Sequence, residues 1–209
     1  MSIVLPGLGL KRCYLGKKEL NPPPAFPALP EGLAVRTFKA PDLQGLGSEA
    51  MDPAMTEHRL ACGDRPWALW RGRDLLAYGW STTRPTSILT LSMLIPGEDE
   101  AYLYGFYTPP QHRGNGYYPL LLRHICAHLA EEGNQRAWIA VFTNNPSSWK
   151  GVLKAGFRKT CTHMALNERL SWTLPEGEEP QPTLRPRHRG LHLGLRMPLR
   201  ALPSRARRR

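Results

Sequence analysis

The stretch Gln111-His112-Arg113-Gly114-Asn115-Gly116 decides the fold, because it stands between a predicted strand and a predicted helix. The aromatic run 101–107 favours a strand before it, and Pro109-Pro110 ends that strand. After it, apolar residues recur at the three- and four-residue steps of an amphipathic helix, namely Tyr118, Leu121, Leu122, Ile125 and Leu129. Glycines at a helix N-terminus leave N–H groups open to an anion, so the sequence predicts a phosphate-binding loop.

Two common phosphate loops do not fit this stretch. The P-loop requires a Lys-Ser/Thr pair after its glycines, and none follows here. The dinucleotide fingerprint requires a third small residue where this chain has Pro119. A tight turn before a helix is the plain alternative for a lone pair of glycines.

A second segment strengthens the phosphate-loop interpretation. The apolar run 136–142 is typical of a strand that is buried on both faces. Asn145 is a natural helix N-cap and Pro146 suits the first helical position. Gly156 then ends the predicted helix, and Phe157 opens another strand.

These two motifs together resemble the GNAT superfamily of acyl-CoA-dependent N-acyltransferases. The phosphate loop of that family reads Q/R-x-x-G-x-G/A, which here is Gln111, Gly114 and Gly116. Its second motif is an Asn shortly after a strand, a small residue three positions later and Gly-Phe at the close of the helix. Here these are Asn145, Ser148 and Gly156-Phe157. The resemblance covers residues 100–165 and extends back to about residue 32. It implies an α/β (α+β) fold with a mixed, strongly twisted central sheet flanked by helices.

The charge of the chain is concentrated in its last segment. The formal net charge is +11, and residues 181–209 hold nine arginines and no acidic residue, so the rest carries 11 − 9 = +2. A basic tail of this kind could bind nucleic acid or another acidic surface through phosphate contacts. A solvated tail without a partner is the simpler alternative.

The remaining composition points to a cytoplasmic protein without metal. The four cysteines are far apart in sequence, which favours neither a zinc site nor a disulfide framework and suits a reducing compartment. The apolar N-terminal stretch is short and lacks a basic start, so it is a poor signal peptide. No apolar run has the length of a membrane span.

We predict three parts along the chain. Residues 1–31 are rich in proline and are expected to form an arm outside the core. Residues 32–170 form the GNAT-like domain, with strands at 32–38, 66–71, 74–82 and 88–95 and two short helices within 41–62. Residues 171–209, rich in Arg and Pro, are expected to be a disordered tail. The strand that ends near Leu166 needs a partner, for which 190–196 is a weak candidate.

The resemblance implies a function and a set of cofactor contacts. The expected reaction moves an acetyl group from acetyl-CoA, the co-substrate, to a primary amine of a small molecule or peptide, by direct attack in a ternary complex. The backbone of the predicted strand end would pair with the pantetheine arm, and the loop and second motif would hold the rest. The implied cofactor-binding residues are Phe106, Tyr107, Thr108, Gln111, His112, Arg113, Gly114, Asn115, Gly116, Tyr117, Asn145 and Ser148.

Candidate catalytic residues follow from the same resemblance. Glu100 stands where some family members carry a base, although a solvated strand end, a water chain or His163 are alternatives. Many members place a Tyr seven residues after the Asn of the second motif, as the acid that protonates the leaving thiolate. This chain has Val152 there. Tyr117 is our candidate acid, with Tyr118, Tyr107 or no dedicated acid as alternatives. A non-catalytic acyl-CoA-binding domain therefore stays open.

The expected acceptor follows from charge. Glu98, Asp99 and Glu100 form the densest acidic cluster of the predicted domain, and the hairpin at 66–82 is rich in aromatic residues. Both features favour a cationic acceptor over an anionic one.

Overall fold

The structure is a computed structural model that describes residues 10–44, 52–88, 92–166, 170–176 and 182–186. Within these ranges the helices are α1 (Pro53–Ala61), α2 (Tyr117–Glu131) and α3 (Pro146–Lys154), with 3-10 turns at Ala40–Leu43 and Pro110–His112. The strands are β1 (Leu10–Glu19), β2 (Leu33–Arg36), β3 (Arg65–Arg71), β4 (Asp74–Thr82), β5 (Thr86–Ile88), β6 (Ser92–Ile95), β7 (Glu100–Tyr107), β8 (Arg136–Phe142), β9 (Arg158–Leu166), β10 (Leu170–Pro175) and β11 (Thr183–Pro186).

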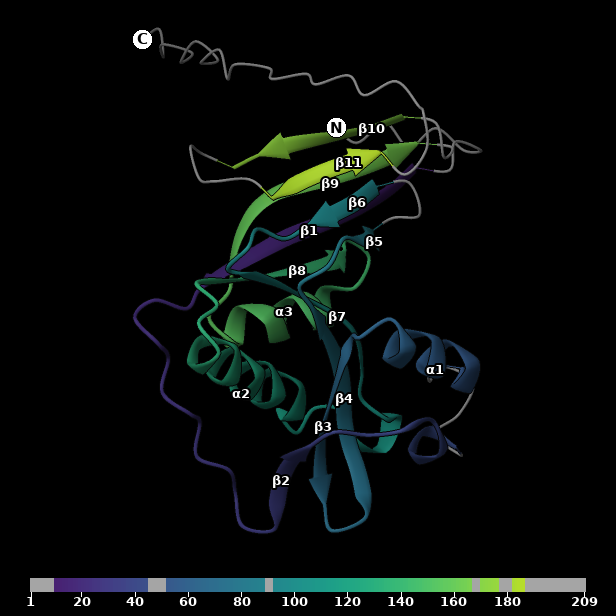
Figure 1. The fold of residues 1–209 in the computed structure, drawn as a ribbon, viewed down its shortest axis with the longest axis vertical. Helices are drawn as coiled ribbons and strands as arrows, with labels where there is room; N and C mark the ends of the chain where they lie inside the picture. The colour runs from purple at the N-terminus through teal and green to yellow at the C-terminus, as the bar shows by residue number, and fades with distance from the viewer. Residues whose placement is uncertain (1–9, 45–51, 89–91, 167–169, 177–181, 187–209) are drawn as a thin grey trace, which may run out of the picture.

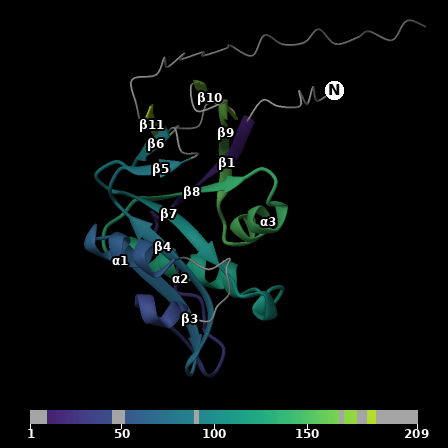
Figure 2. The same ribbon diagram turned by 90° about the vertical axis from the view of Figure 1, so that its right-hand side faces the viewer.

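An eight-stranded sheet runs through the length of the molecule in the order β10-β9-β1-β8-β7-β4-β3-β2 (Figure 1). Its neighbours are antiparallel except β7 and β8, which run parallel. Helices α2 and α3 lie on one face of this sheet, and α1 lies on the other (Figure 2). The predicted α+β class, with a mixed sheet flanked by helices, is confirmed.

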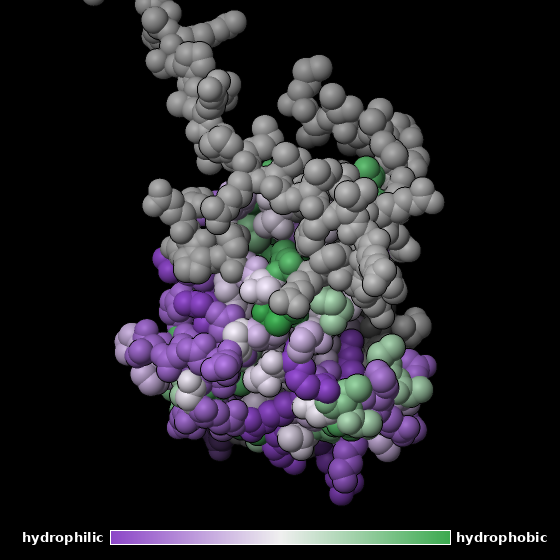
Figure 3. Space-filling model, turned by 45° about the horizontal axis from the view of Figure 1, so that its top comes forward, coloured by the Kyte–Doolittle hydropathy of each residue, from purple (hydrophilic) through white to green (hydrophobic). Residues whose placement is uncertain are grey.

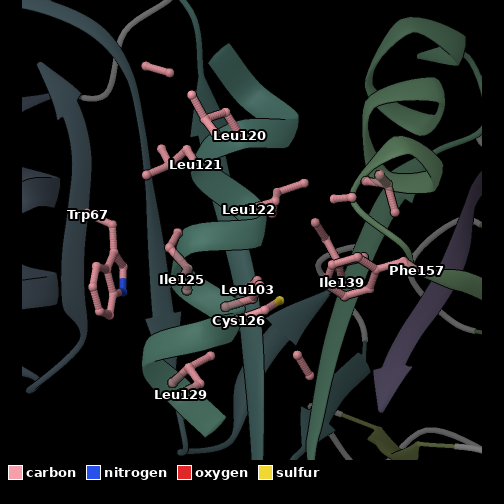
Figure 4. Packing of buried hydrophobic residues seen from close by; sticks show 14 of the residues in the cluster. Trp67, Leu103, Leu120, Leu121, Leu122, Ile125, Cys126, Leu129, Ile139 and Phe157 are labelled. Carbon is pink, nitrogen blue, oxygen red and sulfur yellow. The ribbon is translucent and has the colours of Figure 1, made fainter. Parts of the chain in front are cut away.

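The main core lies between α2 and the middle of the sheet (Figure 4). Leu121, Leu122 and Ile125 of α2 are fully buried and share a cluster with Leu103 of β7 and Ile139 of β8. The apolar period of the sequence therefore marks the face of α2 that packs on the sheet. This packing fixes the N-terminus of α2 beside the end of β7.

The expectation of an N-terminal arm outside the core is wrong for residues 10–20. Strand β1 lies inside the sheet, paired antiparallel with β8 on one side and β9 on the other (Figure 1). Cys13, Leu15 and Leu20 are buried. Strand β1 therefore supplies the partner that β9 needs, and the weak candidate at 190–196 lies outside the described residues.

Strand β1 also supports α3 through side chains. The rings of Tyr14 and Trp149 are 5.2 Å apart between centroids. Lys18 Nζ donates a 2.7 Å hydrogen bond to the backbone oxygen of Ala155, which caps the C-terminus of α3. A cation at this end of a helix is favourable, because it neutralises the helix dipole and an otherwise free carbonyl.

The expectation of a disordered tail is wrong for two short segments. Strand β10 pairs with β9, and β11 pairs with β6 in a separate three-stranded sheet of order β11-β6-β5. The sheets thus extend beyond the predicted domain range of 32–170 at both ends. Residues 187–209, which carry most of the tail arginines, lie outside the described part. The structure therefore does not test whether the tail binds nucleic acid.

The shorter predicted elements are mostly confirmed. Asp52 caps α1 by accepting a 2.7 Å hydrogen bond from the backbone N–H of Ala54. The predicted strand at 88–95 is instead divided between β5 and β6, and residues 89–91 are not described.

No helix in the described ranges is both long and apolar enough to cross a membrane. On the face in Figure 3, the described surface is mainly hydrophilic in its lower half.

Candidate active site

The parallel strands β7 and β8 separate toward their C-terminal ends. Their backbone pairing begins with Glu100 opposite Arg136 and ends with Leu103 opposite Ile139. Both strands continue beyond that point, to Tyr107 and Phe142, and Figure 2 shows them diverging. Backbone groups on the facing edges do not pair across this gap. An extended ligand chain can add to such an edge as an extra strand.

A bulge in β7 turns the strand end toward α2. Tyr78 of β4 pairs with Tyr107, whereas Trp80 pairs with Tyr104, so β7 has one extra residue in this interval. Gly105 accommodates the bulge with a φ of +63°. The ring of Phe106 then lies over Gly79, where an added Cβ would come within 2.2 Å of the ring. The two glycines thus allow Phe106 to face α2.

The predicted phosphate loop leads directly into α2. Gly114 and Gly116 have φ values of +84° and +77°, and an added Cβ at either position would meet nothing within 4 Å. Gly116 is the N-cap of α2 and supplies no side-chain hydrogen bond to the first turn. The Asn115 amide holds the loop by donating to the backbone oxygen of His112 at 3.2 Å. Open backbone N–H groups and the helix dipole therefore face the same space.

A cavity of about 680 Å³ lies between the end of β7, the loop and helices α2 and α3. Ten of the twelve residues implied as cofactor contacts line it, all except Gln111 and Asn115. The sequence-based set missed the lining residues Tyr118, Pro119, Ser147, Lys150, Gly151 and Lys154. The four-residue spacing of the two lysines places both on one face of α3, which was the available signal.

The charged residues that line the cavity are all basic. They are Arg113, Lys150 and Lys154; the lining also contains the imidazole of His112, and no lining residue is acidic. Arg113 is anchored because its Nε donates a 3.0 Å hydrogen bond to the backbone oxygen of Thr108. The cavity is therefore suited to a ligand with several negative charges, such as a nucleotide phosphate chain.

The sequence from residue 33 to residue 157 matches the model of the acetyltransferase (GNAT) family. This match covers more than half of the chain and includes the open strand pair, the loop and α3. The chain belongs to the GNAT family. No curated protein matches the sequence.

Solved structures show the same fold at low sequence identity. A Drosophila protein is 12% identical with a TM-score of 0.57, over 77% of this chain and 51% of that protein. A GNAT-family protein from Novosphingobium aromaticivorans is 17% identical with a TM-score of 0.55, over 79% and 68% of the two chains. An aminoglycoside N-acetyltransferase in complex with CoA is 14% identical with a TM-score of 0.50, over 63% and 92%. This GNAT chain thus spans about half of the Drosophila protein.

The geometry of this GNAT site does not bring Glu100 to the cavity. Glu100 begins β7, whereas the cavity lies at the other end of that strand. Its carboxylate pairs with Arg136 and accepts a 2.8 Å hydrogen bond from Trp138 Nε1. Glu98 and Asp99 lie at the same end, so the acidic cluster is also remote from the opening. A carboxylate engaged in this way is a structural anchor of the closed end of the strand pair.

The side chains of Tyr117 and His163 also have hydrogen-bond partners within the protein. Tyr117 lines the cavity, but its hydroxyl accepts a hydrogen bond from Arg71 Nη2. His163 is fully buried and lies between the hydroxyls of Ser92 at 2.8 Å and Thr173 at 3.0 Å, joining three strands. His163 does not line the cavity.

Tyr118 brings a phenol hydroxyl to the start of α3, whereas Val152 has no hydroxyl. Val152 is fully buried in the main core. Beside it, an added Cβ on Gly151 would come within 2.6 Å of the Tyr118 ring, so α2 and α3 touch at this glycine. The Tyr118 hydroxyl is 3.4 Å from Ser148 Oγ and lines the cavity. Burial raises the pKa of this phenol well above its usual range.

Asn145 and Ser148 shape the start of α3. The side-chain oxygen of Asn145 accepts a 3.0 Å hydrogen bond from the backbone N–H of Ser148 and a 2.9 Å bond from the Ser147 hydroxyl. Asn145 therefore acts as the predicted N-cap and lines the cavity as well. Among the residues that the structure places, no group of three or more His, Cys, Asp or Glu side chains could hold a metal ion.

Proposed function

We propose that this GNAT protein binds acetyl-CoA in the cavity and transfers its acetyl group to a primary amine by direct attack in a ternary complex. The observation that carries the proposal is the gap between β7 and β8, which opens into a basic cavity at an uncapped helix N-terminus. An extended arm and a negatively charged phosphate chain require these two features side by side.

The lining of the cavity suggests where each part of acetyl-CoA would bind. The pantetheine arm would add to the edge of β7 at residues 106–108. The diphosphate would accept hydrogen bonds from the N–H groups of the loop and the first turn of α2. Lys150 and Lys154 would balance further phosphate charge from α3.

The reaction requires one bond to form and one to break. A neutral amine attacks the thioester carbonyl, the C–N bond forms, and collapse of the tetrahedral intermediate breaks the C–S bond. Holding both reactants in attack geometry supplies much of the rate. Because Glu100 is engaged by Arg136, we assign removal of the amine proton to water.

The leaving thiolate needs a proton, and Tyr118 is the best-placed donor in the cavity. Among the described residues its hydroxyl has one hydrogen-bond contact, a long one with Ser148. The phenol is protonated at neutral pH, and burial raises its pKa further. Tyr118 would give its proton to the sulfur and regain one from solvent. This assignment replaces Tyr117, whose hydroxyl is already bound by Arg71.

The test is release of free thiol from acetyl-CoA across a panel of primary amines. We expect turnover with at least one amine and formation of the N-acetyl product by mass spectrometry. If acetyl-CoA binds but no amine is acetylated, the chain is instead a non-catalytic acyl-CoA-binding domain.

A further inference from the structure

An aromatic and cationic cluster lies on the face of the sheet opposite the cavity. Trp80 of β4 and Tyr104 of β7 are paired in the sheet and both contact Arg59 of α1. The guanidinium carbon of Arg59 is 4.5 Å from the centroid of the Tyr104 ring and 5.5 Å from that of the Trp80 ring. The three residues thus come from three elements and meet at one point.

Two hydrogen-bond donors in this cluster have no acceptor. Arg59 Nη1 and Trp80 Nε1 are shielded from solvent, and neither has a hydrogen-bond partner among the residues that the structure describes. Buried donors are almost always paired, because a buried polar group without a partner loses its hydrogen bonds to water. Two such donors in one cluster therefore point to a missing acceptor group.

The charge of Arg59 is also unbalanced. Within the described ranges, no carboxylate lies at ion-pair distance from its guanidinium. The carboxylate of Asp64 contacts the same tyrosine, but it pairs with Arg84 at 2.8 Å and accepts a hydrogen bond from the Tyr104 hydroxyl. A single negative charge would complete the cluster.

The cluster borders the gap between β7 and β8. Tyr104 is the first residue of β7 beyond the last pair of the two strands, which is Leu103 with Ile139. Phe106, which lines the cavity on the opposite face, follows two residues later, about 7 Å along the strand. A molecule held at Arg59 could therefore reach through the gap toward a thioester in the cavity.

We propose that Arg59 and Trp80 bind a carboxylate of the acceptor, so that the substrate is an amine that also carries a carboxylate, as an amino acid does. The Arg59 side chain on α1 is partly exposed, so a carboxylate would approach the cluster from the side of α1. One unpaired guanidinium matches a single carboxylate charge better than a phosphate dianion. The proposal rests on the proposed acetyl transfer, and it departs from the expectation that a cationic acceptor is favoured over an anionic one.

The test compares acceptors in matched pairs. Glycine, β-alanine and 4-aminobutyrate are each assayed beside the corresponding amide, by thiol release from acetyl-CoA. We expect kcat/KM to be about tenfold or more higher for the carboxylates. Arg59→Gln should remove that preference and leave the amides unchanged. Trp80→Phe, which keeps a ring but loses the N–H, should reduce it in part.

The control variant is Arg36→Gln. Arg36 also stacks on a tryptophan of this sheet, 5.2 Å from the ring of Trp70, but it donates to the backbone oxygen of Gly72 and so has a partner. It should keep the carboxylate preference. Equal rates for acids and amides, or an equal loss with both acceptors in Arg59→Gln, would overturn the proposal.

A binding measurement separates this site from the proposed transfer. N-acetylglycine, a product analogue that carries the carboxylate but needs no turnover, should raise the melting temperature of the parent protein and of Arg36→Gln, and not that of Arg59→Gln. This pattern without any amine acetylation would support the carboxylate site while the proposed transfer fails. Turnover of amides alone, with no such shift, would keep the transfer and reject the site.

Discussion

Leu103 of β7 and Ile139 of β8 are the last residues to pair across the parallel strands of this GNAT protein. Beyond them, the basic cavity lies on one face of the sheet and Arg59 on the other. Two reactants can therefore approach the same gap from opposite sides. The predictions below test the parts that build this arrangement.

Tyr118→Phe should lower kcat on the order of 10²-fold, because it removes the proposed proton donor and keeps the ring packed on Gly151. The KM for acetyl-CoA should not change. Since burial raises the phenol pKa, Tyr118 in the parent stays protonated as pH rises through the ordinary phenol value of 10.0, and kcat should not fall there.

Two comparisons check this role of Tyr118. Tyr117→Phe should keep kcat, because the Tyr117 hydroxyl is bound by Arg71. An acetyl thioester with a more acidic thiol should reduce the defect of Tyr118→Phe, since a better leaving group needs less help from an acid. An equal defect with both thioesters would contradict proton donation by Tyr118.

Gly79→Ala should destabilise the fold by about 1–3 kcal/mol and weaken acetyl-CoA binding, because its methyl group would come within 2.2 Å of the Phe106 ring. Urea unfolding and ligand titration measure the two effects. Adding Phe106→Leu should recover part of the stability, since the ring is what collides. Strictly additive effects of the two substitutions would show that the ring does not press on residue 79.

Removal of residues 1–20 should abolish cooperative unfolding, because β1 pairs with both β8 and β9 and buries Cys13 and Leu15. A chain that ends at Pro186 should instead unfold like the full-length protein, since it keeps every described strand. Circular dichroism during heating compares the two. A stable protein without β1 would mean that the sheet does not depend on it.

Asp64→Asn should reduce stability by about 1–3 kcal/mol at neutral pH, because it replaces a charged partner of Arg84 and Tyr104. Burial alone would raise the pKa of Asp64, but hydrogen bonds from Tyr104 and Arg84 outweigh it and hold the pKa below the ordinary value of 3.8. The stabilisation by ionised Asp64 is thus present above the ordinary pKa of 3.8. It is lost as the pH falls through the lower pKa that Asp64 has in the folded protein. The difference from the parent in urea unfolding should shrink below about pH 4. A constant difference would assign the effect to packing.

The elements around the cavity could be predicted because their signals are local. The glycines of the loop, the Asn145 cap and the apolar period of α2 each act within a few residues of themselves. Strand β1 could not be predicted in this way. It contains Gly16, Lys17 and Lys18, which strands disfavour, and its place in the sheet depends on partners more than a hundred residues away.

The surroundings of the candidate catalytic residues could not be predicted, for a related reason. The family resemblance implies Glu100 as the base, but the guanidinium that engages its carboxylate belongs to Arg136 on another strand. The resemblance likewise points to Val152, while the phenol hydroxyl near the start of α3 comes from Tyr118 on α2. In both cases the side chain is placed by packing between elements, which a spacing rule within one element does not contain.

The most direct test of the central claim is a thermal shift with acetyl-CoA. At a hundred times its dissociation constant, acetyl-CoA should stabilise the fold by about 2.7 kcal/mol and raise Tm by roughly 5–10 °C, with no shift from NAD or ATP. Gly114→Glu should abolish the shift, because a carboxylate would then occupy the phosphate position. Gly133→Glu carries a similar backbone strain, with a φ of +92° against +84°, but it lies past the far end of α2 and should keep the shift. A shift retained in Gly114→Glu, or no shift in the parent at millimolar acetyl-CoA, would contradict acetyl-CoA binding at this cavity.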